Sequence, residues 1–474
     1  MLTHFSEAQL ADPNVAEADR ILKSCQHYGF CTSGCPTYVL LHDENDSPRG
    51  RIDLIKEMLE SDAPPKASTV AHLDKCLSCM SCMTTCAVNV DYLHLADVAR
   101  VHIDTHYRRP LADRLLRNAL AFVLPRPKVF ALALRLARGA APFRRALPGT
   151  LRSAVDLLPA SVPAASPTAQ RYPAIGARRA RVALLAGCVQ PVLAPWINAS
   201  TIGLLTRLGC EVVVPPAAGC CGSLTLHMGK EALAQASARA NVDAWIAEMD
   251  GEGLDAIVVN ASGCGSTVKD YAHLLAHDAE RADAAKRVAS IALDISEWLV
   301  KLDPPAPPEP LRYRVAYHDA CSLRNVQRVT AQPRTLLRRA GFLVNDVPEA
   351  HFCCGSAGTY NLLQPEIARD LGVRKAGHIA STAPQIVAAG NIGCLTQIAQ
   401  YSDTPIVHTV ELLDWAYGGP RPHALAGIEL TRMPDDATPT PAPDASAPSN
   451  PHEYPVTFQR PVSPPPAPAD IGLW

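Results

Sequence analysis

The sequence predicts a multidomain α+β protein, in which an α-helical N-terminal domain is followed by two repeated α/β cysteine-rich modules. Three observations lead to this prediction. Seven cysteines form two arrays between Cys25 and Cys86, a Cys-Cys-Gly motif occurs twice in the second half of the chain, and short apolar runs alternate with helical patterns around each copy of that motif. Such alternation is typical of βαβ units and a parallel sheet.

Composition narrows the classes of protein to consider. The chain has 474 residues, of which 48% are hydrophobic, and this length suits about three domains with ordinary globular cores. The formal net charge is −2, whereas a nucleic-acid-binding protein would carry a strongly basic domain. The sequence contains no run of about twenty apolar residues, so we expect no membrane-spanning helix.

Cofactor motifs and cysteine usage indicate metal chemistry. The dinucleotide motif G-x-G-x-x-G and the phosphate-binding motif G-x4-G-K-[ST] are absent, so we expect no flavin on this chain. All sixteen cysteines except Cys210 fall into clusters, which indicates metal ligation in a reducing compartment rather than a disulfide framework. We therefore expect a cytoplasmic protein that contacts the cytoplasmic face of the inner membrane at most peripherally.

The second cysteine array has a spacing typical of ligands to cubane iron–sulfur clusters. Its pattern is C-x2-C-x2-C-x3-C, formed by Cys76, Cys79, Cys82 and Cys86. In this pattern three thiolates face one cluster and the fourth points to a second cluster, so two such arrays exchange their fourth ligands. Zinc also binds C-x2-C pairs, but zinc sites close with two pairs rather than with a run of three cysteines and a fourth.

The first array departs from this pattern at one position, because Tyr28 stands where the second cysteine belongs. Exchange of fourth ligands then predicts one complete and one incomplete site. The complete site consists of Cys35, Cys76, Cys79 and Cys82, and the incomplete site consists of Cys25, Cys31 and Cys86. Three thiolates suit a [3Fe-4S] cluster or a four-iron cluster with one labile iron, whereas a phenolate ligand from Tyr28 fits a sulfur-preferring cluster less well.

Helices are predicted around both arrays, in a first domain over residues 1–107. A short helix over residues 15–22 leads to the first array. Ser47 and Pro48 are typical of an N-cap and a first helical residue, and the helix that follows is expected to lie between the two clusters. Arg49 and Arg51 on its first turns either raise the potential of a cluster or are simply solvated. Residues 92–106 also have a helical period.

Residues 108–178 are predicted to contain two basic amphipathic helices and a linker. Between Arg108 and Arg145, ten lysines and arginines accompany a single acid, Asp113, and prolines at 125 and 127 divide the stretch. Such helices either lie on an anionic membrane surface or dock one face on the protein. Residues 146–178 are rich in Ala and Pro and are predicted to be the linker.

The second half of the chain is a duplication, with one module over residues 179–305 and another over 311–420. Each copy has a cysteine after an apolar run, a Cys-Cys-Gly motif 32 residues later, and a fourth cysteine after a further apolar run. The eight cysteines are Cys188, Cys220, Cys221 and Cys264 in the first copy, and Cys321, Cys353, Cys354 and Cys394 in the second. Because open α/β sheets place their sites at the carboxyl ends of strands, we expect the four cysteines of each copy to converge on a further iron–sulfur cluster.

Two remaining features are expected to lie outside the sites. Cys210 has no counterpart in the second copy and is predicted to be a buried thiol. Residues 421–474 are predicted to form a disordered tail, because twelve prolines follow from Pro434 onward among Ala, Ser, Thr and Asp.

The arrays and the two modules together resemble the iron–sulfur subunits of glycolate oxidase. Three stretches carry the resemblance to this family: Gly29–Tyr38, Asp43–Arg51 and His72–Cys79. The Cys-Cys-Gly modules alone are less specific, since they also occur in lactate-utilisation proteins, anaerobic glycerol-3-phosphate dehydrogenase and heterodisulfide reductase. Tyr28, and Ala87 in place of the proline that usually follows the last cysteine, depart from the family pattern at the incomplete site.

The resemblance implies an oxidoreductase complex in which substrate oxidation and electron transfer are carried out by different subunits. A separate FAD-containing flavoprotein would oxidise glycolate or related 2-hydroxy acids, and this chain would relay the electrons toward a membrane acceptor such as quinone, with no catalytic residue of its own. The alternatives are the iron–sulfur subunit of a lactate or glycerol-3-phosphate dehydrogenase, a thiol–disulfide reductase that works at a Cys-Cys-Gly cluster, and a structural module that holds zinc.

Overall fold

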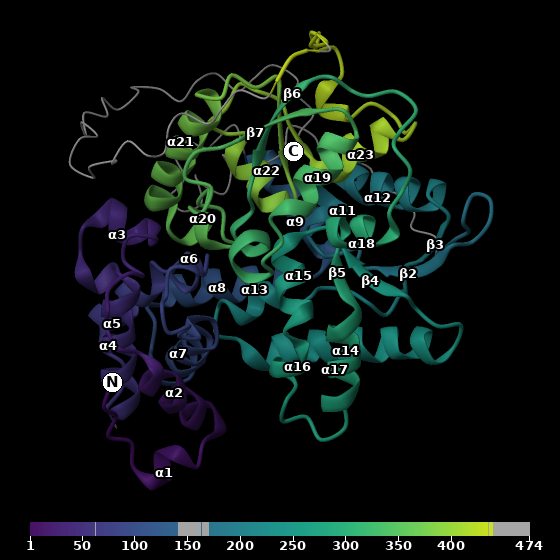
Figure 1. Cartoon of the computed structure of the whole chain (residues 1–474). Helices are drawn as coiled ribbons and strands as arrows, with labels where there is room; N and C mark the ends of the chain where they lie inside the picture. Colours follow the sequence, from purple (N-terminus) through teal and green to yellow (C-terminus); the bar gives the residue numbers. More distant parts are fainter. Residues whose placement is uncertain (62, 141–162, 164–169, 435, 439–474) are drawn as a thin grey trace.

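A computed structural model describes residues 1–61, 63–140, 163, 170–434 and 436–438. The N-terminal helical domain lies on one side of the molecule and contacts both cysteine-rich modules, which pack against each other (Figure 1). No helix in these residues is long and apolar enough to cross a bilayer. The predicted α+β class, with a helical domain followed by two α/β modules, is confirmed.

Short helices make up the N-terminal domain. They are α1 (Glu7–Leu10), α2 (Pro13–Ser24), α3 (Pro36–Leu41), η1 (Glu44–Asp46), α4 (Pro48–Glu60), α5 (Ala67–Asp74), α6 (Ser81–Thr84) and α7 (Tyr92–His106). Helix α4 begins as predicted, with Pro48 in its first turn and the Ser47 hydroxyl accepting a hydrogen bond from the Gly50 N–H. One core cluster joins α2, α4 and α7 through Ile21, Ile55 and Leu95. This core fixes the chain on both sides of the cysteine loops.

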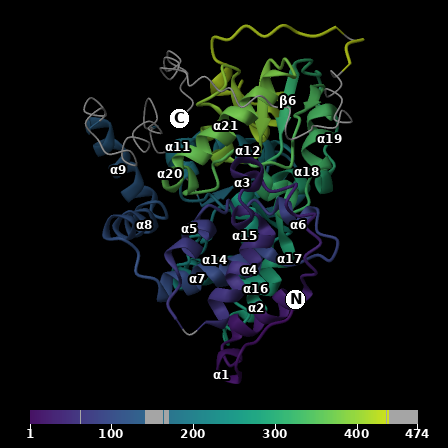
Figure 2. The same ribbon diagram turned by 90° about the vertical axis from the view of Figure 1, so that its left-hand side faces the viewer.

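Helices α8 (Leu111–Val123) and α9 (Pro127–Ala140) form the basic hairpin, which stands at the edge of the molecule (Figure 2). Phe130 and Leu134 of α9 are buried against Val192 of α11, and Arg117 of α8 is buried in ion pairs with Asp74 and Asp113. One face of the hairpin is therefore docked on the protein. Five large apolar side chains of the hairpin nevertheless remain exposed: Leu111, Leu115, Phe122, Leu132 and Leu136.

The first module is a five-stranded sheet of order β1-β3-β2-β4-β5, parallel except for β1. Its strands are β1 (Arg171–Tyr172), β2 (Ala180–Leu184), β3 (Cys210–Val213), β4 (Ala256–Val259) and β5 (Ala292–Asp294). Its helices are α11 (Gln190–Leu193), α12 (Pro195–Arg207), α13 (Ser223–Leu226), α14 (Glu231–Asp250), α15 (Ser262–Lys269), α16 (Tyr271–Leu274), α17 (Ala282–Ile291) and α18 (Ile295–Leu302). Strand β1 lies in the stretch predicted as linker, of which residues 146–162 and 164–169 fall outside the described residues. Cys210 is fully buried in β3, as predicted.

The second module repeats this plan with a four-stranded parallel sheet of order β7-β6-β8-β9. Its strands are β6 (Arg314–His318), β7 (Leu343–Asp346), β8 (Ile386–Ala389) and β9 (Ile406–His408). Its helices are η3 (Ser322–Val326), α19 (Ala331–Arg339), α20 (Tyr360–Leu363), α21 (Pro365–Ala380), α22 (Ile392–Ile398), α23 (Thr409–Ala416) and η4 (His423–Leu425).

The modules pack reciprocally, because α12 of the first contacts α23 of the second while α18 of the first contacts α19 of the second. One core cluster runs through both modules, and an ion pair joins Arg207 to Asp414 across the contact. The second module also extends past residue 420, where a disordered tail was predicted. Ala424 and Leu425 of η4 are buried in the shared core, so apolar packing overrides the local composition there. The rest of the predicted tail, beyond residue 438, lies outside the described residues.

Candidate metal centres

Four cysteines of the N-terminal domain line one cavity, which we call the second site: Cys35, Cys76, Cys79 and Cys82. The loop between α5 and α6 turns sharply because Ser78 and Met80 adopt left-handed backbone conformations, with φ of 52° and 54°. This turn directs the backbone N–H groups of Ser78 and Ser81 to the sulfurs of Cys76 and Cys79. Such N–H···S bonds stabilise negative charge on sulfur and tune the potential of a bound cluster.

Three further cysteines, Cys25, Cys31 and Cys86, line a neighbouring cavity, which we call the first site. Tyr28 belongs to the wall of this cavity, but 63% of its surface is exposed. Burial together with the charge of the Cys25 thiolate raises the pKa of the Cys31 thiol to about 11. A cation is therefore needed to hold the Cys31 thiol in the thiolate form at neutral pH.

Helix α4 lies between the two sites, as predicted. Pro48 lines both cavities, Arg49 and Ile52 line the first, and Arg51 lines the second. Arg49 is half-exposed and pairs with Glu44. The interpretation of Arg49 as a solvated arginine thus fits, whereas the same interpretation of Arg51 is wrong.

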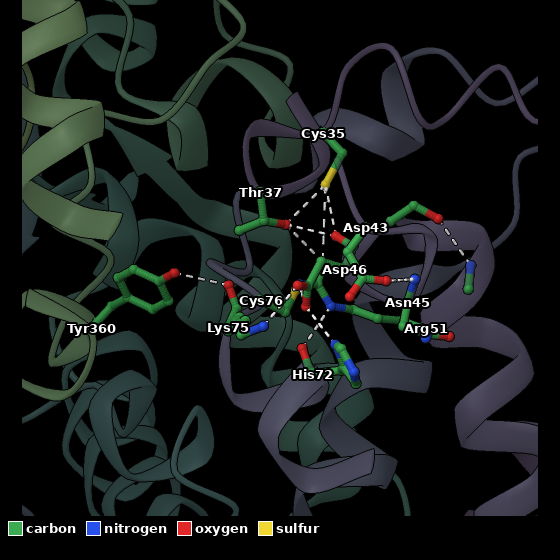
Figure 3. Close-up of polar contacts among 12 residues, drawn as sticks. Cys35, Thr37, Asp43, Asn45, Asp46, Arg51, His72, Lys75, Cys76 and Tyr360 are labelled. Atoms are coloured by element: carbon green, nitrogen blue, oxygen red, sulfur yellow. Dashed lines mark hydrogen bonds and ion pairs between the residues drawn. The ribbon is translucent and has the colours of Figure 1, made fainter. Parts of the chain in front are cut away.

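Arg51 is 1% exposed and is held in a polar network beside the second site (Figure 3). Its Nη1 lies 3.9 Å from the Cys35 sulfur and donates to Thr37 Oγ1 at 2.9 Å, and its Nε donates to the His72 carbonyl at 2.9 Å. Burial opposes its charge, but Cys76, Tyr92, Cys35 and Asp46 raise the pKa of Arg51 above its ordinary value. The arginine therefore brings a fixed positive charge to the thiolates.

The carboxylate of Asp46 forms an ion pair with Arg51 and so compensates its positive charge. Its side chain is 1% exposed and pairs with Arg51 Nη2 at 3.5 Å, His72 Nδ1 at 2.8 Å and Lys75 Nζ at 2.8 Å (Figure 3). Burial alone would raise the pKa of the Cys76 thiol, but the guanidinium groups of Arg51 and Arg100 lower it below its ordinary value. The network thus favours a thiolate at Cys76, the form that binds iron.

In the first module the four predicted cysteines lie together at the carboxyl ends of β2 and β4. Cys188 interacts with Cys220, and Cys221 with both Cys220 and Cys264. Gly222 has a φ of 91° and lies so close to α14 that an added Cβ would be 2.9 Å from the Ala234 carbonyl oxygen. The glycine of the Cys-Cys-Gly motif is therefore required by the backbone.

The second module gathers its cysteines in the same way. Cys321 Sγ and Cys353 Sγ are 3.7 Å apart, Cys354 interacts with Cys353 and Cys394, and Gly355 repeats the left-handed conformation with a φ of 93°. The buried ring of His318 joins this group, because one donor atom from each of His318, Cys354 and Cys394 lies within 4.8 Å of the other two. Nothing in the sequence pattern had marked this histidine as a site residue.

The second site and the second module meet directly. Cys79 and Cys353 belong to one small core cluster with Leu77 and Tyr360, and burial together with Cys353 raises the pKa of the Cys79 thiol. Asn325 Nδ2 donates to the Cys79 carbonyl at 2.9 Å, and the Tyr360 hydroxyl donates to the Lys75 carbonyl at 2.9 Å. Sequence analysis missed this contact because its partners are more than 240 residues apart.

These cysteine sets fit iron–sulfur clusters in their donor chemistry. Fifteen cysteines converge in three sets of four and one set of three. Even so, all sixteen cysteines of the chain are free thiols and none forms a disulfide. Soft thiolate donors in buried cavities suit iron–sulfur clusters, and they also suit zinc.

Comparison with known proteins shows to which class of metalloprotein the chain belongs. A model of the 4Fe-4S dicluster domain matches residues 24–91, and a model of the cysteine-rich domain matches residues 182–269 and 315–399. The chain is thus built from domains of iron–sulfur proteins. It is 40% identical over 420 residues to the glycolate oxidase iron–sulfur subunit of Escherichia coli K12, covering 88% of this chain and 99% of that subunit. It therefore belongs to the family of glycolate oxidase iron–sulfur subunits, which confirms the predicted resemblance.

One further relative agrees with this assignment, and one solved structure resembles the fold. The probable glycolate oxidase iron–sulfur subunit of Bacillus subtilis 168 is 32% identical over 396 residues, covering 80% of this chain and 88% of the relative. A crystal structure of a hypothetical protein from Helicobacter pylori matches with a TM-score of 0.53 and 8% identity, covering 91% of this chain and 76% of that one. That likeness concerns the fold alone.

Proposed function

We propose that this chain is the electron-transfer subunit of an oxidoreductase complex of the glycolate oxidase type. In this complex a separate FAD-containing flavoprotein removes two electrons and two protons from glycolate or a related 2-hydroxy acid, and this chain passes the electrons to quinone or another membrane acceptor. Identity with the two curated relatives supports the substrate class. The absence of the dinucleotide motif supports placing the flavin on another subunit.

The contact between the second site and the second module carries this proposal. A relay needs neighbouring centres that are shielded from water, and Cys79 packs against Cys353 in a buried apolar cluster with Leu77 and Tyr360. We infer that electrons pass between these two centres. The first site adjoins the second site across α4, since Pro48 and Cys82 line both cavities.

We assign Cys35, Cys76, Cys79 and Cys82 as ligands of a [4Fe-4S] cluster, which when bound supplies one-electron transfer. We assign Cys25, Cys31 and Cys86 as the three thiolates of a [3Fe-4S] or labile four-iron cluster. The exposed position of Tyr28 supports this incomplete set, because the phenol is 63% exposed at the rim of its cavity. The cysteines of the two modules are proposed to hold further clusters.

The flavoprotein is proposed to dock at the first site. Phe30 and Val88 are exposed and line the same cavity as Tyr28, and Val88 belongs to the loop that follows Cys86. A surface with exposed aromatic side chains is typical of a protein interface. Docking there would place the flavoprotein beside the more exposed of the two N-terminal sites.

The α8–α9 hairpin is proposed to contact the membrane from the cytoplasmic side. Leu115, Leu132 and Leu136 are more than half exposed on helices that also carry exposed arginines, and this combination suits an anionic lipid surface. Cosedimentation of the chain with anionic liposomes at low salt tests this contact. No binding, or equal binding after Leu132 and Leu136 are both changed to serine, would contradict it.

The complex purified anaerobically tests the relay. Glycolate should reduce the iron–sulfur clusters in the complex, measured by electron paramagnetic resonance of freeze-quenched samples, and should reduce a soluble quinone. The isolated chain with glycolate should show neither reaction. The proposal fails if glycolate reduces the flavin of the complex while every cluster on this chain stays oxidised.

A further inference from the structure

His318 is a buried polar side chain without a partner. It ends strand β6, is 1% exposed, and neither of its ring nitrogens has a hydrogen-bond partner among the described residues. Buried polar groups are almost always hydrogen-bonded, because a buried donor or acceptor without a partner has lost its bonds to water. A group that binds in this site is therefore expected to interact with the imidazole nitrogens.

The surroundings of the ring identify the kind of ligand. One donor atom from each of His318, Cys354 and Cys394 lies within 4.8 Å of the other two, while the Cys321 and Cys353 sulfurs are 3.7 Å apart. Two sulfurs bound to one tetrahedral metal at about 2.3 Å each lie roughly 3.8 Å apart. Five donors exceed the four that one tetrahedral ion takes, which favours a centre with more than one metal.

The first module provides an internal comparison. Leu184 pairs with Val258 in the first sheet as Tyr317 pairs with Ala388 in the second, so the residues that follow, Leu185 and His318, occupy equivalent positions. Leu185 is buried in a core cluster with Cys221. The same place beside the same motif thus holds a hydrocarbon in one module and an imidazole in the other.

The two modules also differ at a second position near their cysteines. Gly222 lies against Ala234 in the first module as Gly355 lies against Ala368 in the second, and seven residues further along these helices stand Asn241 and Lys375. Lys375 is buried, donates to the Glu349 carbonyl at 2.7 Å and interacts electrostatically with Cys353 and Cys354. At these two positions the second module therefore has an imidazole and a buried lysine, where the first module has a leucine and an asparagine.

We propose that His318 is a ligand to one iron of an iron–sulfur centre that Cys321, Cys353, Cys354 and Cys394 hold in the second module. Imidazole is a regular ligand of iron, and a neutral imidazole adds no negative charge to a centre that four thiolates already hold. The assignment of the ligand depends on iron in this module and not on glycolate as substrate.

The test uses the full chain, purified anaerobically after growth with 15N-labelled histidine. Pulsed electron paramagnetic resonance of oxidised and stepwise-reduced samples should detect a histidine nitrogen coupled to a cluster. His318→Leu, which copies the first module, should lose this coupling and shift the midpoint potential of that cluster. His318→Cys should keep the iron but also lose the coupling, which shows that the loss does not come from misfolding.

His408→Asn is the matched control. His408 is also buried with an unpartnered Nε2 but caps α23 through Nδ1, a role that asparagine can take over. This variant should keep the nitrogen coupling. The proposal is overturned if no histidine nitrogen couples to any cluster, if the coupling survives in His318→Leu, or if zinc replaces iron in the second module. None of these readouts depends on glycolate turnover.

Discussion

The two cysteine sites of the N-terminal domain come from arrays with the same spacing, except that Tyr28 replaces one cysteine, and they differ in how the protein encloses them. At the second site four thiols lie in a cavity beside Arg51 and Asp46, which are both 1% exposed, and the second module covers Cys79. The first site has three thiols and a rim where Tyr28 is exposed. The protein therefore encloses the second site more completely than the first, which is open to solvent at Tyr28.

Among the changes considered, removing the charge of Arg51 should have the largest effect on the difference between the two sites. Arg51→Met leaves Asp46 buried with one cation fewer, and breaking a buried ion pair costs about 3–5 kcal/mol. We expect the second-site cluster signal and about four irons per chain to be lost, while the first-site signal remains. Iron analysis, electron paramagnetic resonance and urea unfolding measure these changes.

Arg49→Met is the matched control, on the same turn of α4. Arg49 and Glu44 are each more than one-third exposed, and surface pairs of this kind contribute about 0–1 kcal/mol. This variant should retain its iron. Equal loss of iron in the two variants would show that the network around Arg51 has no special role at the second site.

Replacing Tyr28 should change the first site alone. Tyr28→Cys restores the four-cysteine pattern, and because the side chain is exposed we expect a change in stability within about 0.5 kcal/mol. The oxidised three-iron signal, or the labile iron, should give way to a stable [4Fe-4S] cluster with up to one additional iron per chain. A Tyr28→Ser variant should keep the wild-type signal. If serine and cysteine give the same spectrum, the fourth position of the first site does not face a metal.

The contrast between the sites could be predicted only in part. Cysteine spacing predicts the two sets, and the helix start at Ser47 and Pro48 predicts the position of α4 between them, because each of these signals is a local sequence pattern. The burial of Arg51 could not be predicted, since the same amphipathic pattern fits a solvated arginine. Contacts such as Asn325 with the Cys79 carbonyl, or His318 with Cys354 and Cys394, join segments that no local pattern connects.

The attachment of the first site to the first module should respond to pH. His94, eight residues after Cys86, bonds to Asp91 at 2.6 Å and to Asp270 of the first module at 3.1 Å, and stacks on His273. Burial alone would lower the pKa of His94, but hydrogen bonds to Asp270 and Asp91 raise it to about 10. Because the unfolded value is about 6.5, this contribution is fully present below about pH 6.5 and is lost as the pH rises through 10.

His94→Gln tests this titration. The substitution should lower the free energy of unfolding by about 1–2 kcal/mol at pH 6, after allowance for screening of the partly exposed carboxylates, and by much less at pH 10.5. Urea unfolding across this pH range measures the change. A loss that is the same at both pH values would mean that His94 stabilises the contact without its charge.

The contact between the second site and the second module uses hydrogen bonds between neutral groups. Its contribution to the free energy of unfolding should therefore be smaller than that of His94 and should not depend on pH near neutrality. Tyr360→Phe removes the bond from the Tyr360 hydroxyl to the Lys75 carbonyl, at a cost of about 1 kcal/mol. Tyr417→Phe removes a bond to the Pro305 carbonyl, which involves none of the cysteine sets and is exposed to solvent, and should cost less. Because Lys75 precedes Cys76, only Tyr360→Phe should alter the second-site signal and its magnetic coupling to the second module. Equal spectra in the two variants would mean that this hydrogen bond stabilises the fold without positioning the relay.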